Sequence, residues 1–273
     1  MTRRGFTLVE LLVTMAVMGI LGGALVRLTI NQSRYVGEQE ALMEARQTSR
    51  QAMNLLATEL RMVSDSGVVR VAFDSITVRV PYAFGMLCGV SGGARIASVL
   101  PYDSAAWDNA VSPGVAWRTG GGFRPAGSVT VAASAATSAC TSDSIRVVTG
   151  GALIALSPSS VLSSANAGGL MYLYETVTYR FATSGVLPGR RALYRVSGGT
   201  AEELLAPFAS TAGFAYLTGS RLTLTTTVPS NLNTVTGFEL RLIAESSVTP
   251  SGRTAPITYD LRPRVRLGNK PLD

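Results

Sequence analysis

The stretch Gly5-Phe6-Thr7-Leu8-Val9-Glu10 opens an apolar segment that continues to Val26. Between Phe6 and Val26 the only charged residue is Glu10. A helix of this length, about 31 Å, is long enough to cross the apolar core of a bilayer. A carboxylate in such a helix costs on the order of 2.5–3.5 kcal/mol at the bilayer centre. Glu10 therefore needs a partner, and we treat it as a functional residue.

A cut between Gly5 and Phe6 would supply that partner. The cut creates a new terminal amine on Phe6, which is positively charged. When apolar helices of neighbouring subunits pack together, the Glu10 carboxylate of one subunit can pair with the Phe6 amine of the next. The pairing neutralises both charges where an unpaired carboxylate is expensive. The position of Glu10 thus favours an assembly role.

The six residues from Gly5 to Glu10, after the basic leader Met1-Thr2-Arg3-Arg4, resemble the processing and N-methylation site of type IV prepilins and type II secretion pseudopilins. The resemblance implies cleavage after Gly5 by a prepilin peptidase, methylation of the Phe6 amine and a filament role for Glu10. It implies a single-pass protein of the inner membrane with a periplasmic domain, later part of an extracellular pilus or a periplasmic pseudopilus. The implied partners are other major and minor pilins or pseudopilins, the inner-membrane assembly platform and membrane lipid.

Two other interpretations of this terminus are open. In a Sec signal peptide, Arg3-Arg4 would form the basic region and Gly22-Gly23-Ala24 a poor cleavage site, but Glu10 would have no explanation. A plain membrane anchor explains the length of the apolar segment but not the order of residues from Gly5 to Glu10.

Residues 31–64 predict an amphipathic continuation of the same helix. They are rich in good helix formers, and no proline occurs before Pro81. Apolar or small residues recur every three or four positions. These positions are Leu42, Ala45, Ser49, Ala52/Met53, Leu56, Leu60 and Val63. We expect a leader at 1–5, a membrane helix at 6–30 and this amphipathic continuation at 31–64.

Residues 65–273 predict a β-rich periplasmic head. Alternating apolar residues mark strands at 68–73, 75–80, 171–182, 192–196 and 235–244, with others expected at 143–149, 152–156, 214–217, 222–228 and 257–267. Leu204 to Phe208 is interpreted as a short helical turn. Residues 81–140 are rich in Gly, Ser and Ala and predict an irregular insertion with a few short strands. The fold class expected is α+β and pilin-like, a long helix packed on an antiparallel sheet.

The chain has two cysteines, Cys88 and Cys140, and no histidine. In an extracytoplasmic domain this pair favours one disulfide, and two free buried thiols are the alternative. Without histidine, the Ser-His-Asp and Cys-His catalytic arrangements and the familiar zinc sites are excluded. We predict no enzyme activity, no cofactor and no metal. The only candidate for a calcium site, Asp103 with Asp108 and Asn109, is better explained as a solvated loop.

The formal net charge is +7, and Lys270 is the only lysine among the 24 basic residues. The arginines are scattered, so we do not expect nucleic acid as a partner. The order Val177-Thr178-Tyr179-Arg180, Leu193-Tyr194-Arg195, Glu203-Leu204-Leu205-Ala206 resembles the large minor pilins of the PilW type. It is also similar to the J-type minor pseudopilin of type II secretion. Two roles remain open. The chain could prime or cap the filament, or the insertion could make it a filament-tip adhesin or DNA-uptake module.

Overall fold

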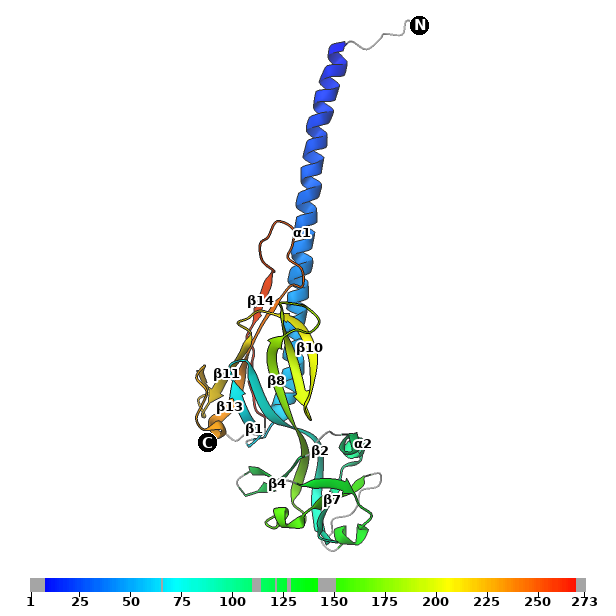
Figure 1. Ribbon diagram of the computed structural model, residues 1–273, viewed down its shortest axis with the longest axis vertical. Coiled ribbons are helices and arrows are strands. Elements are labelled where there is room, and N and C mark those ends of the chain that lie inside the picture. Colours follow the sequence, from blue (N-terminus) through cyan, green and yellow to red (C-terminus); the bar gives the residue numbers. More distant parts are fainter. Residues whose placement is uncertain are drawn as a thin grey trace.

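One long helix followed by a large antiparallel sheet makes up the molecule, which confirms the expected α+β class. The computed structural model describes residues 8–64, 66–109, 114–120, 122–126, 129–141 and 151–268, with the side chains of 105, 108 and 109 left out. Helix α1 (Leu8–Met62) projects from the body over its first half and lies against the sheet over its second half (Figure 1). A second, smaller lobe lies at the end of the molecule opposite the N-terminus.

The remaining elements follow the helix in chain order. The strands are β1 (Val68–Ala72), β2 (Ser75–Ser91), β3 (Ala94–Val99), β4 (Gly114–Thr119), β5 (Gly122–Pro125), β6 (Thr130–Ala133), β7 (Ala152–Ser157), β8 (Leu170–Thr183), β9 (Arg191–Ser197), β10 (Thr200–Phe208), β11 (Gly213–Thr218), β12 (Thr223–Thr225), β13 (Val235–Glu245), β14 (Thr258–Leu261) and β15 (Arg264–Arg266). The short helices are η1 (Pro101–Asp103), α2 (Ser104–Asn109), η2 (Thr137–Cys140), η3 (Ser159–Leu162) and η4 (Leu232–Thr234).

The second half of α1 buries one stripe of small and apolar side chains against the sheet. Ala45, Ala52, Leu56 and Leu60 have no exposed surface, and they belong to the main apolar core. The small residues bring the helix axis close to β13. There the Ser49 hydroxyl donates a hydrogen bond of 2.9 Å to the carbonyl of Leu242. The predicted buried stripe is confirmed except at Leu42 and Met53, which are half-buried.

Strand β2 is longer than the sequence predicted. We expected it to end at Val80, but it continues through Pro81 to Ser91 and pairs with β8 as far as Met86. The register shifts between Pro81 and Ala83, where the proline has no N–H to donate. Strands β2 and β8 therefore pass from the main body into the distal lobe and carry it.

The segment 81–140 contains the few short strands that were expected, but it is more regular than an irregular insertion. Besides the end of β2, it contains β3, β4, β5, β6, η1, α2 and η2. These elements enclose a separate apolar core that includes Leu87, Val115, Trp117 and Leu173. Gly92 and Gly93, which favoured irregular structure, form the turn between β2 and β3 and adopt positive φ. We call this part, residues 81–173, the distal lobe.

Three further predictions differ from the structure or fall outside it. Leu204 to Phe208 is not a helical turn but the end of β10, which pairs with β9, since tertiary pairing overrides the helical preference of Glu-Glu-Leu-Leu. The strand expected at 257–267 is split into β14 and β15 around Pro263. The strand expected at 143–149 lies outside the described residues.

Candidate assembly site

The first half of α1 is an apolar rod that no other described part of the chain covers. Its large side chains are exposed, from Leu8 at 76% to Ile30 at 46%. The described helix is long and apolar enough to cross a membrane, and none of its most apolar part is buried in the body. Such a surface is unfavourable in water, because each large apolar side chain that stays exposed lacks about 1.5–3 kcal/mol of stabilisation from burial. This half of the helix must therefore lie in lipid or against other chains.

Glu10 lies in the first turn of α1, on an exposed part of the helix. A carboxylate at this end of a helix interacts favourably with the helix dipole. The other two residues of the predicted processing and assembly set, Gly5 and Phe6, lie outside the described residues. Their proposed relation to Glu10 stays a prediction.

Two threonines of the apolar rod have hydroxyls that are bonded within the helix. The Thr14 hydroxyl donates to the Leu11 carbonyl at 2.8 Å, and the Thr29 hydroxyl donates to the Leu25 carbonyl at 3.0 Å. Such bonds to the preceding turn remove the cost of placing a hydroxyl in apolar surroundings. Between Leu8 and Val26, Glu10 is thus the one charged residue in a surface that otherwise suits lipid or neighbouring helices.

A strap between β13 and β14, residues 246–257, holds α1 where the apolar rod meets the body. Arg253 forms an ion pair of 2.9 Å with Glu38, and the backbone N–H of Ser247 donates to Glu44 at 3.1 Å. In Figure 1 this loop reaches along the helix beyond the sheet. Sequence analysis missed these contacts because more than 200 positions separate the partners. These contacts mark the point where the apolar rod ends, near Arg34, which lies beside Gly252 of the strap.

A polar network fastens the other end of α1 to the sheet. The Tyr179 hydroxyl donates to the Glu59 carboxylate, which also pairs with Arg195 at 3.6 Å. Arg195 in turn pairs with Glu175 at 3.3 Å, and these three charged side chains are between 16% and 28% exposed. Burial raises the pKa of Tyr179, as do the charge and hydrogen bond of Glu59, while Arg195 opposes the rise. The network fixes which face of α1 meets the sheet.

Tyr179→Phe is expected to lower the free energy of unfolding by about 1–3 kcal/mol, because Glu59 loses a donor in a partly buried site. The raised pKa has a consequence in alkali. The native chain should lose stability as pH rises above about 10, the ordinary tyrosine value, whereas the variant lacks this contribution. Chemical denaturation against pH measures both effects. Tyr102→Phe is the control, since Tyr102 is 97% exposed; equal changes in the two variants would contradict the role of the network.

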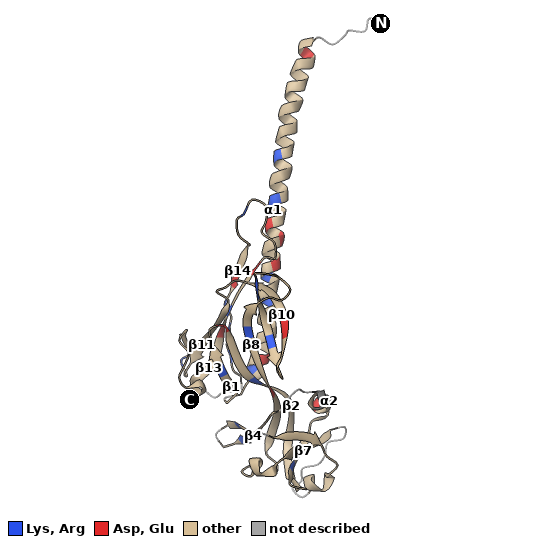
Figure 2. Cartoon of the chain, viewed as in Figure 1, with Lys and Arg blue, Asp and Glu red and all other residues tan. Residues whose placement is uncertain are grey.

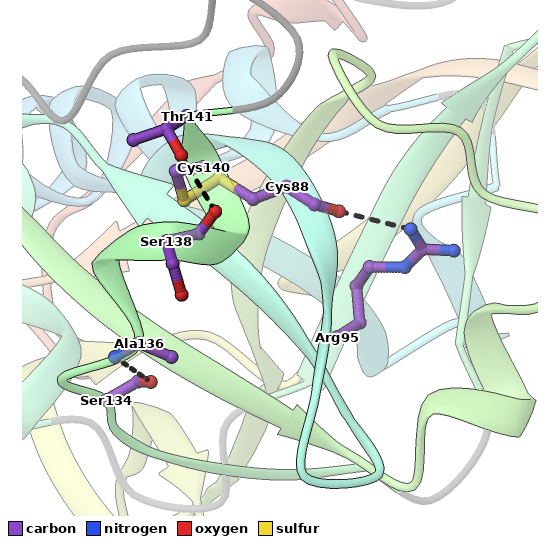
Figure 3. Close-up of a disulfide and its surroundings, with 7 residues drawn as sticks. All are labelled: Cys88, Arg95, Ser134, Ala136, Ser138, Cys140 and Thr141. Atoms are coloured by element: carbon purple, nitrogen blue, oxygen red, sulfur yellow. Dashed lines mark hydrogen bonds between the residues drawn. A yellow bond between two sulfur atoms is a disulfide. The ribbon is translucent and has the colours of Figure 1, made fainter.

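The disulfide lies in the distal lobe, far from the apolar rod. Cys88 of β2 and Cys140 of η2 are bonded in the structure, across a sequence separation of 52. Figure 3 shows the bond beside Arg95, whose guanidinium donates to the Cys88 carbonyl at 3.1 Å. Arg95 also donates to the carbonyl of Ala165 at 2.7 Å. The disulfide and the arginine together join η2, β2 and the loop after η3.

Of the three residues considered for a calcium site, only Asp103 has a described side chain. The Asp103 carboxylate accepts a hydrogen bond of 2.8 Å from the backbone N–H of Phe84, which gives it a structural role. The side chains of Asp108 and Asn109 lie outside the described part of the chain. Across the residues that the structure describes, no group of three or more His, Cys, Asp or Glu side chains is placed to hold a metal ion.

Basic and acidic side chains are interspersed over the main body (Figure 2). Many arginines have acidic partners, including Arg190 with Glu245 at 2.8 Å and Arg264 with Glu239 at 3.2 Å. An arginine engaged by a carboxylate has less to offer a phosphate. That nucleic acid is not a partner stays a prediction.

Comparison with known proteins finds a family match at the N-terminus. Residues 1–26 match the family model described as the prokaryotic N-terminal methylation motif. No curated protein matches the chain at the significance required, and no solved structure does. The match covers the processing site, Glu10 and most of the apolar rod, which are the features that sequence analysis singled out. The chain therefore carries the N-terminal motif of a type IV pilin or pseudopilin precursor, a class of structural subunits processed by a prepilin peptidase and assembled with other pilins.

Proposed function

We propose that this chain is a minor type IV pilin that primes or caps a pilus filament. A prepilin peptidase cleaves between Gly5 and Phe6, the Phe6 amine is methylated, and Glu10 pairs with the amine of a neighbouring subunit. The observation that carries the proposal is an N-terminal methylation motif continuous with an uncovered apolar rod. Such a rod suits a lipid bilayer before assembly and a helix bundle afterwards.

The body of the molecule suits a subunit that occurs in few copies. Its sheet extends from the main body into a distal lobe, which makes the head large and elongated (Figure 1). A head of this shape restricts how many identical neighbours can pack around one helix bundle. In this proposal, residues 1–5 are the leader, 6–30 the membrane helix, 31–64 its continuation and 65–273 the periplasmic head. The protein resides in the inner membrane until assembly.

The J-type minor pseudopilin of a type II secretion system is the alternative, with the same processing and the same use of Glu10. The two differ in the machine that recruits the chain. Deleting the pilus assembly platform and the secretion platform separately, and asking which deletion removes the chain from filaments, distinguishes them. A second function, binding at the filament tip, is favoured by the distal lobe, which lies farthest from the membrane helix.

Intact-mass and N-terminal analysis of the chain from its native membrane tests the proposal. We expect a chain that begins at methylated Phe6. Deleting the prepilin peptidase should restore the leader and shift the mass accordingly. A chain cut near Ala24, or one left uncut in the presence of the peptidase, would overturn the filament proposal and leave a secreted or anchored β domain.

A further inference from the structure

The sheet of the distal lobe has two apolar faces. Strands β2, β8 and β4 lie side by side, and successive side chains point to opposite faces. One face carries Val115 and Trp117, which belong to the core of the lobe. The other carries Tyr172 and Tyr174, which form a separate cluster with Phe123. This second face is only partly covered, since Tyr172 and Tyr174 are buried while Phe84 and Leu170 beside them are exposed.

A cavity of about 370 Å³ lies on this second face. Its lining comes from β2, β8, the β4–β5 hairpin and the residue after β3. Pockets that hold small ligands in proteins measure about 300–1,000 Å³ and are mostly apolar. Phe84, Leu100 and Leu170 border the cavity and are 40%, 45% and 45% exposed, so apolar surface reaches from the floor to the opening.

Tyr172, one of the aromatic residues that line the cavity, is fixed by a hydrogen bond and by ring contacts. Tyr172 is 2% exposed, and its hydroxyl shares a hydrogen bond of 2.5 Å with the hydroxyl of Ser64, just after α1. Its ring centroid lies 4.8 Å from that of Phe123 and 5.9 Å from that of Phe84, both in tilted arrangements. A ligand that enters therefore meets a wall that is already ordered, which lowers the entropic cost of binding.

Arg118 is the charged member of the lining. It lies on β4, directly opposite Phe123 on β5. Over the part of the chain that the structure describes, no carboxylate lies within ion-pair distance of its guanidinium. This contrasts with Arg190, Arg195 and Arg253, which all have acidic partners. The cavity therefore combines three aromatic rings with one unpaired cation.

We propose that this cavity binds a free aromatic carboxylate. The ring lies among Phe84, Phe123 and Tyr172, where offset or edge contacts between rings are favourable. The carboxylate pairs with Arg118, whose planar guanidinium matches its geometry. The site is in the distal lobe, away from the apolar rod, so it does not depend on how the chain assembles (Figure 1).

Fluorine NMR of the full-length chain in detergent tests the site. The probes are fluorophenylacetate and its neutral counterpart fluorophenylacetamide, each titrated with protein and compared with a detergent-only sample. The native chain should broaden the fluorine resonance of the carboxylate probe. It should bind this probe about tenfold more tightly than the amide probe, because only the carboxylate forms a charge-assisted bond. Arg118→Gln should weaken carboxylate binding by about tenfold and leave amide binding unchanged.

Arg124→Gln is the matched control, since Arg124 is exposed on the same β4–β5 hairpin but does not line the cavity. Its effect on both probes should be within twofold. Phe84→Ala should weaken both probes together, because it removes part of the shared aromatic wall. Equal affinities of the two probes for the native chain, equal effects of the two arginine variants, or no broadening beyond detergent alone would each overturn the proposal.

Discussion

Glu10→Ala is expected to leave cleavage after Gly5 intact and to reduce incorporation into filaments by on the order of a hundredfold. The physical reason is the Phe6 amine, which would enter an apolar helix bundle without its partner. Removing one member of a buried ion pair costs about 3–5 kcal/mol, and each 1.4 kcal/mol corresponds to a factor of ten. The measurement is the ratio of filament-bound to membrane-bound chain in sheared-filament fractions, with the N-terminus verified by mass.

Glu40→Ala is the matched control. Glu40 is exposed on the same helix but lies beyond the apolar rod, so its loss should change incorporation less than twofold. Glu10→Gln separates charge from shape, since it keeps the size of the side chain and should behave like alanine. Normal incorporation of both Glu10 variants would refute the pairing, while a general assembly defect in all three would point to the helix rather than to the charge.

Removing the disulfide is expected to have the largest effect on stability. Replacing both Cys88 and Cys140 with alanine opens a loop with a sequence separation of 52. In the chain-entropy model, such a loop contributes about 4 kcal/mol. We expect the loss to concentrate in the distal lobe, whose apolar core is separate from that of the main body. Hydrogen exchange of the full-length variant, measured by mass spectrometry and compared with the native chain, should accelerate more in β3 and β7 than in β11 and β13.

Chemical reduction provides the control for this experiment. Reducing agent should lower the stability of the native chain by a similar amount and leave the double-alanine variant unchanged. Two titratable thiols in the native, unreduced protein would reject the disulfide. Uniformly faster exchange in both parts would instead show that the distal lobe and the main body unfold as one unit.

Local patterns in the sequence were enough to predict the helix and most long strands. The buried stripe of α1 depends on residues three or four apart, and the β13 pattern depends on alternate residues such as Phe238, Leu240 and Leu242. Both signals lie within one element. The N-terminal motif is equally local, because its match lies within residues 1–26. These features therefore needed no knowledge of the rest of the chain.

The features that the sequence predicted wrongly, or did not indicate at all, depend on contacts between distant residues. Strand β2 continues past Pro81 only because β8 pairs with it, and the distal lobe forms a core only when both strands carry it. Tyr179 reaches Glu59 across 120 positions, and the cavity beside Arg118 joins four separate segments. The sequence by itself thus determined the membrane helix, its processing motif and its amphipathic continuation, since neighbouring residues specify them. Only the tertiary structure decided how the head is divided, which residues hold the helix and where a cavity opens, because those features form between side chains that are far apart in the chain.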